Sequence, residues 1–135
     1  MDRDIEIMAK TIYGEARGEY SCKNGGLKSL IAVGNVIMNR SKSSGDSITA
    51  VCLKPKQFSC WNKDDPNRKI IEKATAKDKA YQLCFITAAK IISEEIGDAT
   101  NGANHYYSRF LENPPKWAKN KKPVAEIGNH IFFKL

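Results

Sequence analysis

The chain has 135 residues and a formal net charge of +7, and 41% of its residues are hydrophobic and 27% charged. This composition is typical of a globular protein and excludes extensive disorder, and the length fits a single domain over residues 1–135. No apolar run approaches the roughly 20 residues that span a bilayer, and the charged segment Met1–Asp4 does not resemble a secretory signal.

Hydrophobic residues recur at helical spacing in the first third of the chain. The pattern predicts one helix over residues 4–17, ended by Gly18, and a second over about 26–40. Residues 41–46 are rich in Ser, Gly and Asp, which predicts a loop. Residues 51–65 contain scattered aromatic and proline residues, and we expect an irregular segment there.

The hydrophobic period changes in the second half of the chain. A third helix is predicted over about 78–96, with Gly97 as its stop. Beyond it, residues 104–109 and 125–134 are predicted as short strands that pair across a proline-rich loop. Helices followed by a small antiparallel sheet in the C-terminal part make an α+β fold.

Glu15 is the residue that is hardest to explain structurally. It lies at the edge of the apolar stripe, near the predicted helix end, where an unpaired carboxylate is unfavourable. Burial generally raises the pKa of a carboxyl group, as general-acid catalysis near neutral pH requires. Thr11, Gly14 and Gly18 form a strip of small residues that leaves room for a substrate. The alternative, that Glu15 pairs with Arg17 or a distant lysine, is equally compatible with the helix pattern.

The predicted loop from Lys54 to Asn62 carries aromatic and amide side chains that a core does not require there. Aromatic rings stack on the apolar faces of sugars and amides bind sugar hydroxyls, so the segment suits a sugar-binding groove. Alternatively, Phe58 and Trp61 fill the core; we favour this slightly for Phe58 and leave it open for Trp61. The candidate substrate-binding residues of this loop are Gln57, Phe58, Ser59 and Trp61.

A second aromatic group lies in the segment from Gly102 to Tyr107. Its three consecutive ring residues cannot all face one side of a strand, so at least one points away from the core. His105 either orients a substrate or carboxyl group or is a hydrogen-bonded structural residue. His105 and His130 are only weak evidence for a metal site, because no other ligand lies at a suitable spacing. We therefore expect no metal and no other cofactor. The candidate substrate-binding residues here are Asn104, His105, Tyr106 and Tyr107.

The cysteines and the charge distribution leave more than one interpretation open. Cys22, Cys52, Cys60 and Cys84 include no Cys-x-x-Cys pair, which disfavours a zinc ribbon or redox site. Cys84 is predicted to be buried, whereas Cys52 and Cys60 could form a disulfide after exposure to an oxidising space.

Residues 1–20 contain three basic and five acidic residues, so the positive charge lies beyond them, partly in the run from Lys116 to Lys122. Such an imbalance suits nucleic acid, lipid head groups or an acidic cell-wall polymer, although a solvated surface explains it as well. Glu19, beyond the first predicted helix, is expected to be solvated or ion-paired.

Five blocks of sequence stand out in chain order: TIYGEARGE (11–19), VGNVIMNR (33–40), PKQFSCWN (55–62), GANHYY (102–107) and IGNHIFF (127–133). Together they resemble the SleB/CwlJ-type cell wall hydrolases, which include spore cortex-lytic enzymes and phage or prophage lysis proteins. The resemblance covers nearly the whole chain. It implies a lysozyme-like catalytic domain that cleaves the glycan strands of peptidoglycan. Its catalytic residue would be Glu15, the first Glu of the Gly-Glu-Ala-Arg-Gly-Glu block.

The chain departs from the family pattern in several respects. Asn104 stands where the family often has Thr, and Glu126 where a basic or small residue is usual; we interpret Glu126 as a surface residue. A signal peptide and a wall-binding module are not evident. We therefore expect an endolysin-like protein that is synthesised in the cytoplasm without a signal peptide and acts on the bacterial wall after release. By analogy, a Gram-negative host fits.

Residues and resemblance together predict that protonated Glu15 donates its proton to the oxygen between N-acetylmuramic acid and N-acetylglucosamine. Because no second carboxylate is evident, ionised Glu15 then acts as base on the muramic C6 hydroxyl, giving the 1,6-anhydro product of a lytic transglycosylase. The alternatives are a hydrolytic muramidase, a zinc-dependent amidase and, from another class, a basic nucleic-acid-binding domain. We expect a monomer that acts on glycan strands and binds no specific nucleic acid.

Overall fold

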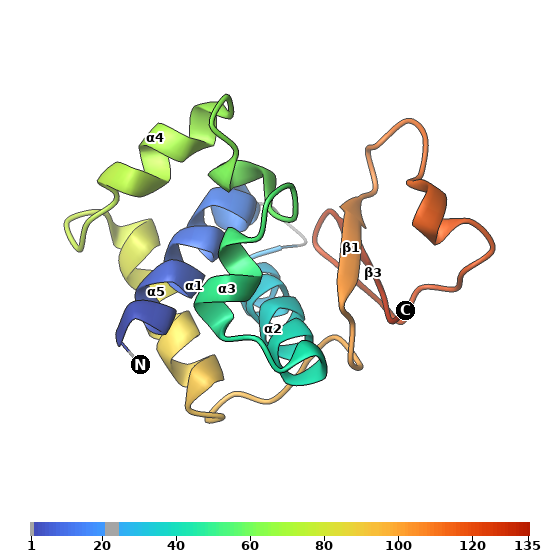
Figure 1. The fold of residues 1–135 in the computed structure, drawn as a ribbon, viewed down its shortest axis with the longest axis horizontal. Coiled ribbons are helices and arrows are strands. Elements are labelled where there is room, and N and C mark those ends of the chain that lie inside the picture. The colour runs from blue at the N-terminus through green and yellow to red at the C-terminus, as the bar shows by residue number, and fades with distance from the viewer. Residues whose placement is uncertain (1, 21–24) are drawn as a thin grey trace.

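A computed structural model describes residues 2–20 and 25–135, so Cys22 lies outside the described residues. A helical body and a small sheet make up the structure, with the sheet at one side of the helices (Figure 1). In chain order the elements are α1 (Asp2–Ala16), η1 (Arg17–Glu19), α2 (Leu27–Ser44), α3 (Ile48–Leu53), η2 (Ser59–Trp61), α4 (Pro66–Lys73), α5 (Lys79–Ile92), β1 (His105–Ser108), η3 (Lys116–Ala118), β2 (Ala125–Ile127) and β3 (His130–Phe133).

Helix α1 is the centre of the helical body. It packs against α2, α3, α4 and α5, and Met8, Ala9 and Ile12 on its apolar stripe are fully buried. Helices on so many sides leave little of α1 exposed, which is why its apolar stripe is wide. The predicted end at Gly18 is close to the observed one, because α1 stops at Ala16 and continues as the 3₁₀ turn η1.

Helix α2 is longer than predicted and includes most of the segment 41–46, for which we expected a loop. It ends at Gly45, whose left-handed backbone (φ 79°) and N–H bond to Ser41 O (2.9 Å) are a common helix C-cap. Serine is only mildly unfavourable in helices, so tertiary contacts can override its loop preference. One such contact is the ion pair between Lys42 and Glu94, with a distance of 2.8 Å between Lys42 Nζ and Glu94 Oε1.

Two short helices were not predicted. In α3, which overlaps the segment expected to be irregular, Ser47 Oγ accepts a hydrogen bond from Ala50 N (3.0 Å). In α4, Asp65 accepts one from Asn67 N (2.8 Å), and Pro66 occupies the first turn. Helices of 6 and 8 residues are too short for a periodic pattern to stand out. Their stability comes from packing on the rest of the helical body.

Helix α5 confirms the third predicted helix but ends earlier than expected. Asp78 caps its start by accepting a hydrogen bond from Ala80 N at 2.8 Å. The helix stops at Ile92, and Glu94 then adopts a left-handed backbone (φ 63°), so Gly97 is not its terminator. Cys84 is fully buried within it, as predicted.

The C-terminal sheet is antiparallel, in the order β1-β3-β2. The single strand predicted over 125–134 is two strands, because Gly128 (φ 59°) turns the chain between β2 and β3. Strand β1 pairs with β3 in a register that sets Tyr106 opposite Phe132. Phe132 is fully buried against Ala32 and Val36 of α2, which attaches the sheet to the helices. The predicted α+β fold is confirmed.

Candidate active site

Glu15 lies in the last turn of α1 and is half-buried. Tyr106 Oη donates a hydrogen bond to Glu15 Oε1 (2.8 Å), and Cys60 N donates one to Oε2 (3.3 Å). Arg17 points elsewhere and donates to Tyr13 O and to Asn67 Oδ1. In the described part of the chain no Lys, Arg or His lies within ion-pair distance of Glu15. The alternative of a Glu15–Arg17 pair is therefore not what the fold adopts.

The strip of small residues beside Glu15 is filled by the protein itself at Thr11 and Gly14, which corrects our expectation of free space there; the space at Gly18 is open. A Cβ on Gly14 would lie 2.7 Å from Cys60 Cβ, so the glycine lets Cys60 come close. Thr11 is fully buried, and its hydroxyl accepts a hydrogen bond from Trp61 Nε1 (2.8 Å). Only at Gly18 would a Cβ meet nothing within 4 Å. The glycine at 14 brings the Cys60 N–H to the carboxylate.

The two donors to Glu15 are neutral groups that keep their protons. Burial, and then the charge of Glu15, raise the pKa of Tyr106 well above its ordinary value. The other donor is the backbone N–H of Cys60, which does not ionise near neutral pH. The Cys60 thiol beside it also stays protonated, because burial, with Glu15 adding to the effect, raises its pKa. The carboxyl group of Glu15 thus sits among neutral donors, so it can exchange a proton with a ligand without breaking an ion pair.

Glu19 has a different environment from Glu15. It is buried, with 9% of its surface exposed, and accepts hydrogen bonds from Asn129 N and Nδ2 (both 2.7 Å). His130 Nδ1 lies 3.5 Å from its Oε1, and a Cβ on Gly128 would come within 2.8 Å of the same atom. Of the two expected alternatives, solvated or ion-paired, the solvated one is therefore wrong, and the ion-paired one corresponds to the contact with His130 when His130 is protonated. Glu19 joins η1 to the turn between β2 and β3.

The rings of β1 alternate between the faces of the sheet, as expected for a strand. Tyr106 points to the helices and Glu15, whereas His105 and Tyr107 lie against Trp117, with ring centroids 4.9 and 5.9 Å apart. Tyr107 also stacks on Phe133 (5.6 Å). Because Tyr107 faces away from Glu15, the structure does not bring it to the site with the other candidates.

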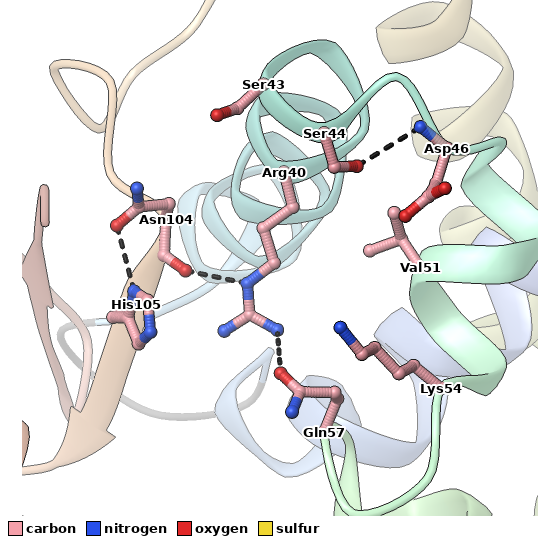
Figure 2. Close-up of a pocket in the computed structure, with 9 residues that line it drawn as sticks. All are labelled: Arg40, Ser43, Ser44, Asp46, Val51, Lys54, Gln57, Asn104 and His105. Carbon is pink, nitrogen blue, oxygen red and sulfur yellow. Dashed lines mark hydrogen bonds between the residues drawn. The ribbon is translucent and has the colours of Figure 1, made fainter.

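A cavity of about 220 Å³ lies between the end of α2, the region of α3 and the start of β1, and Figure 2 shows the residues that line it. The Arg40 side chain lines this cavity and connects two of its sides. Its Nε donates a hydrogen bond to Asn104 O (2.7 Å), and its Nη1 donates one to Gln57 Oε1 (3.4 Å). The lining residues are Arg40, Ser43, Ser44, Asp46, Val51, Lys54, Gln57, Asn104 and His105. The structure therefore brings together three predicted residues, Gln57, Asn104 and His105, which come from two distant segments.

The remaining predicted residues are placed less favourably for direct contact with a sugar. Phe58 is 2% exposed, so its ring belongs to the core and its assignment to substrate binding is corrected. Trp61 is half-buried against Thr11, while Ser59 is exposed. The Asn104 amide is engaged with the C-terminal residue, donating to Leu135 O (3.0 Å) and accepting from Leu135 N (2.9 Å).

Arg40 is the site residue that we did not predict, although it ends the block 33–40. Its guanidinium lies over the Phe58 ring, 4.9 Å from the centroid. Burial lowers the pKa of Arg40, and its electrostatic interactions with Tyr106, Cys52 and Glu15 oppose that shift. The sequence signal for Arg40 was the polar pair Asn39-Arg40 at the end of the apolar stripe of 26–40. This signal is weak, because solvated arginines are common at such positions.

Cys52, Cys60 and Cys84 are free thiols, so the disulfide left open for Cys52 and Cys60 is not formed in this structure. Burial raises the pKa of Cys52 to about 12, which leaves its thiol protonated and unreactive. Within residues 2–20 and 25–135, no group of three or more His, Cys, Asp or Glu side chains comes together as a metal site. None of the described helices is both long and apolar enough to cross a membrane.

The sequence matches the model of a protein family described as Cell Wall Hydrolase over residues 25–133. A spore cortex-lytic enzyme of Bacillus cereus is 30% identical, in an alignment that covers 97% of this chain and 44% of that protein. Another, from Halalkalibacterium halodurans, is 29% identical over 97% of this chain and 34% of its own length. The chain thus spans less than half the length of these relatives.

Two solved structures share the fold. The catalytic domain of the Bacillus cereus SleB protein superposes with a TM-score of 0.70 at 23% identity, covering 99% of this chain and 91% of that one. The catalytic domain of the germination-specific lytic transglycosylase SleB from Bacillus anthracis gives a TM-score of 0.69, also at 23% identity, over 99% of this chain and 96% of its own. The predicted lysozyme-like architecture is confirmed by these matches.

The contact between Gly14 and Cys60 predicts that Gly14→Ala is destabilising. The new methyl group would overlap Cys60 and lie 3.0 Å from Ile71 Cγ2, and such overpacking costs about 1–3 kcal/mol, more than alanine gains in helix propensity. Urea denaturation should show this loss. Gly18→Ala is the matched control and should change the free energy of unfolding by less than about 0.5 kcal/mol. Equal effects of the two substitutions would contradict the packing described.

His130 predicts a dependence of stability on pH. Burial lowers the pKa of His130, and the charge of Glu19 only partly offsets this. As the pH falls below about 6.5, the unfolded chain takes up a proton here before the folded protein does, so the free energy of unfolding decreases until the lowered pKa is passed. In His130→Gln, the free energy of unfolding should fall less steeply between pH 7 and 5 than in the wild type. Some pH dependence should remain, because burial also lowers the pKa of His105. An unchanged slope would refute this assignment.

Proposed function

Because the chain belongs to the cell wall hydrolase family, we propose that it is a glycosidase that cleaves peptidoglycan between N-acetylmuramic acid and N-acetylglucosamine. The observation that carries this proposal is the environment of Glu15, a half-buried carboxyl group held by two neutral donors. General-acid catalysis needs a carboxyl group that is positioned but not neutralised by a cation. The cavity of Figure 2 is lined by polar side chains that suit a sugar strand, and one of them, Arg40, lies within electrostatic range of Glu15.

In the first step, protonated Glu15 transfers its proton to the glycosidic oxygen as the bond from that oxygen to C1 of muramic acid breaks. Positive charge develops at C1 and its ring oxygen, as in glycosidases generally. Tyr106 and the Cys60 N–H hold the resulting carboxylate through the hydrogen bonds to its two oxygens. These donors stabilise the charge that Glu15 gains in this step.

In the second step, the muramic C6 hydroxyl attacks C1 and its proton passes to ionised Glu15, which restores the acid. The 1,6-anhydro product follows, and the enzyme is a lytic transglycosylase. Support comes from the other carboxylates near the sheet: Glu19 is buried and bound to Asn129, while Glu126 is exposed beside Arg109, at 4.0 Å. Glu19 is thus committed to the turn before β3 and Glu126 is a surface residue, which favours neither as the nucleophile of a retaining hydrolase.

The biological setting that we propose is lysis of a bacterial host cell, by a protein that acts as a monomer on the wall after release from the cytoplasm. The relatives are named as cortex-lytic enzymes of spores, and the lytic role is carried over from them. A net charge of +7 suits attraction to anionic wall polymers.

Glu15→Gln should strongly reduce cleavage, because the amide has no acidic proton to transfer to the glycosidic oxygen. We expect a loss of at least about 10²–10⁴-fold in the release of fragments from purified wall, measured by mass spectrometry. Glu126→Gln, which removes an exposed carboxylate, is the control and should keep wild-type activity. Retained activity in Glu15→Gln removes the residue from its role. Reducing-end muramic acid in wild-type digests, in place of the anhydro form, identifies a muramidase.

Tyr106→Phe should lower kcat while leaving KM nearly unchanged, because the hydroxyl stabilises the carboxylate that forms during reaction. A hydrogen bond to a charged group contributes about 1.5–3 kcal/mol, which corresponds to a decrease of at least about tenfold. Tyr107→Phe makes the same chemical change on the opposite face of the strand and should leave kcat unaltered. The role assigned to Tyr106 fails if both variants behave alike in steady-state kinetics on soluble glycan fragments.

A further inference from the structure

The cavity in Figure 2 holds two cationic groups that the mechanism does not use. The Arg40 guanidinium and the Lys54 ammonium extend from different elements into the same space, from α2 and from the residue that follows α3. We propose that this cavity binds a carboxylate carried by the muramic acid unit of the substrate, either on its lactyl group or on its peptide stem. The proposal rests on the proposed function.

Arg40 is held in place before any ligand arrives. Its guanidinium lies on the buried Phe58 ring at 4.9 Å and donates to Asn104 O and Gln57 Oε1. A guanidinium remains charged even where burial lowers its pKa. Among the described residues, no Asp or Glu forms an ion pair with Arg40 or Lys54. A cation that is partly desolvated and lacks an acidic partner favours an anionic ligand.

The other ionisable side chains that line the cavity leave its net charge positive. Burial lowers the pKa of His105, so this side chain is neutral at pH 7. Asp46 is exposed and lies beside Val51, on the opposite wall from Arg40 in Figure 2. Its backbone N–H is bound by Ser44 Oγ at 3.1 Å. Two cations against one carboxylate leave the cavity with a net positive charge.

Arg40 connects the cavity to Glu15, because it lines the cavity and lies within electrostatic range of the Glu15 carboxylate. The loop 54–62 and strand β1 also contribute residues to both. Gln57 lines the cavity, and Cys60, later in the same loop, donates to the carboxylate. His105 lines it, and the next residue, Tyr106, donates to the other carboxylate oxygen. The charge of Glu15 also acts on Arg40, whose pKa it raises. In the proposed binding mode, a ligand group held by Arg40 therefore belongs to a sugar near the bond that is cleaved.

Of the two sugars in the proposed substrate, only muramic acid carries an acidic group. Its lactyl ether ends in a carboxylate, which is either free or extended by a peptide with carboxylates of its own, whereas N-acetylglucosamine is neutral. Binding of this group would distinguish the two sugars and so set the direction in which the strand lies over Glu15. The cavity would then select the bond on one side of muramic acid and reject the other.

The test is a binding titration followed by NMR, with the side-chain amides of Gln57 and Asn104 as reporters. The probes are N-acetylmuramic acid, which has a free lactyl carboxylate, and N-acetylmuramoyl-L-alanyl-D-isoglutamine, which has a carboxylate only on its peptide. Each is compared with its own carboxamide. Lys54→Gln removes one cation of the cavity, and Lys56→Gln, an exposed lysine that does not line it, is the matched control.

We expect at least one acid to bind the wild type about five- to tenfold more tightly than its carboxamide, and the acid that does so identifies the source of the carboxylate. Lys54→Gln should lose this preference, and Lys56→Gln should keep it. Equal binding of acid and carboxamide to the wild type, or an unchanged preference in Lys54→Gln, overturns the proposal. Cleavage of glycan strands by the same wild-type sample is measured in parallel, so failure of the carboxylate site is distinguished from failure of the proposed glycosidase activity.

Discussion

The hydrogen bonds from Tyr106 and Cys60 to the two oxygens of Glu15 are the interactions on which the rest of the site depends. They join α1 to a strand and a loop that are distant in sequence, and they bring the sheet against the helical body. Since both donors are neutral, they orient the carboxyl group of Glu15 without forming an ion pair with it. A cation in the same place would orient Glu15 equally well but would hold it as a carboxylate, unable to act as an acid.

Glu15 and Glu19 lie in the same sequence block but have different roles in the fold. Glu15 faces the loop and β1, whereas Glu19 is buried and binds Asn129 in the turn before β3. Strand β3 pairs with β1, with His130 opposite Ser108. By holding the turn, Glu19 therefore helps to place the strand that carries Tyr106. One carboxylate carries the proposed chemistry and the other supports the position of its donor.

Close backbone packing is a second constraint on the site. The loop that contains Cys60 reaches Glu15 only because Gly14 has no side chain at the contact. The aromatic residues of this loop are then drawn inward: Phe58 becomes the platform for Arg40, and Trp61 covers Thr11. What the sequence suggested as a sugar-stacking surface is largely a support for polar groups, with Gln57 and Ser59 left exposed.

The sequence by itself determined the long helices, the α+β class and the buried Cys84, because helical period and capping residues are local features. The helix pattern left the role of Glu15 open, and the resemblance of the five sequence blocks made it the catalytic candidate, which stays a prediction. The sequence did not reveal α3, α4 or the turn at Gly128, since such short elements depend on contacts more than on pattern. Only the tertiary structure decided that Tyr106 meets Glu15 while Tyr107 turns away, that Cys60 fills the space at Gly14, and that Arg40 enters the cavity. Each of these outcomes depends on the distance between segments far apart along the chain, and no local spacing of residues encodes that distance.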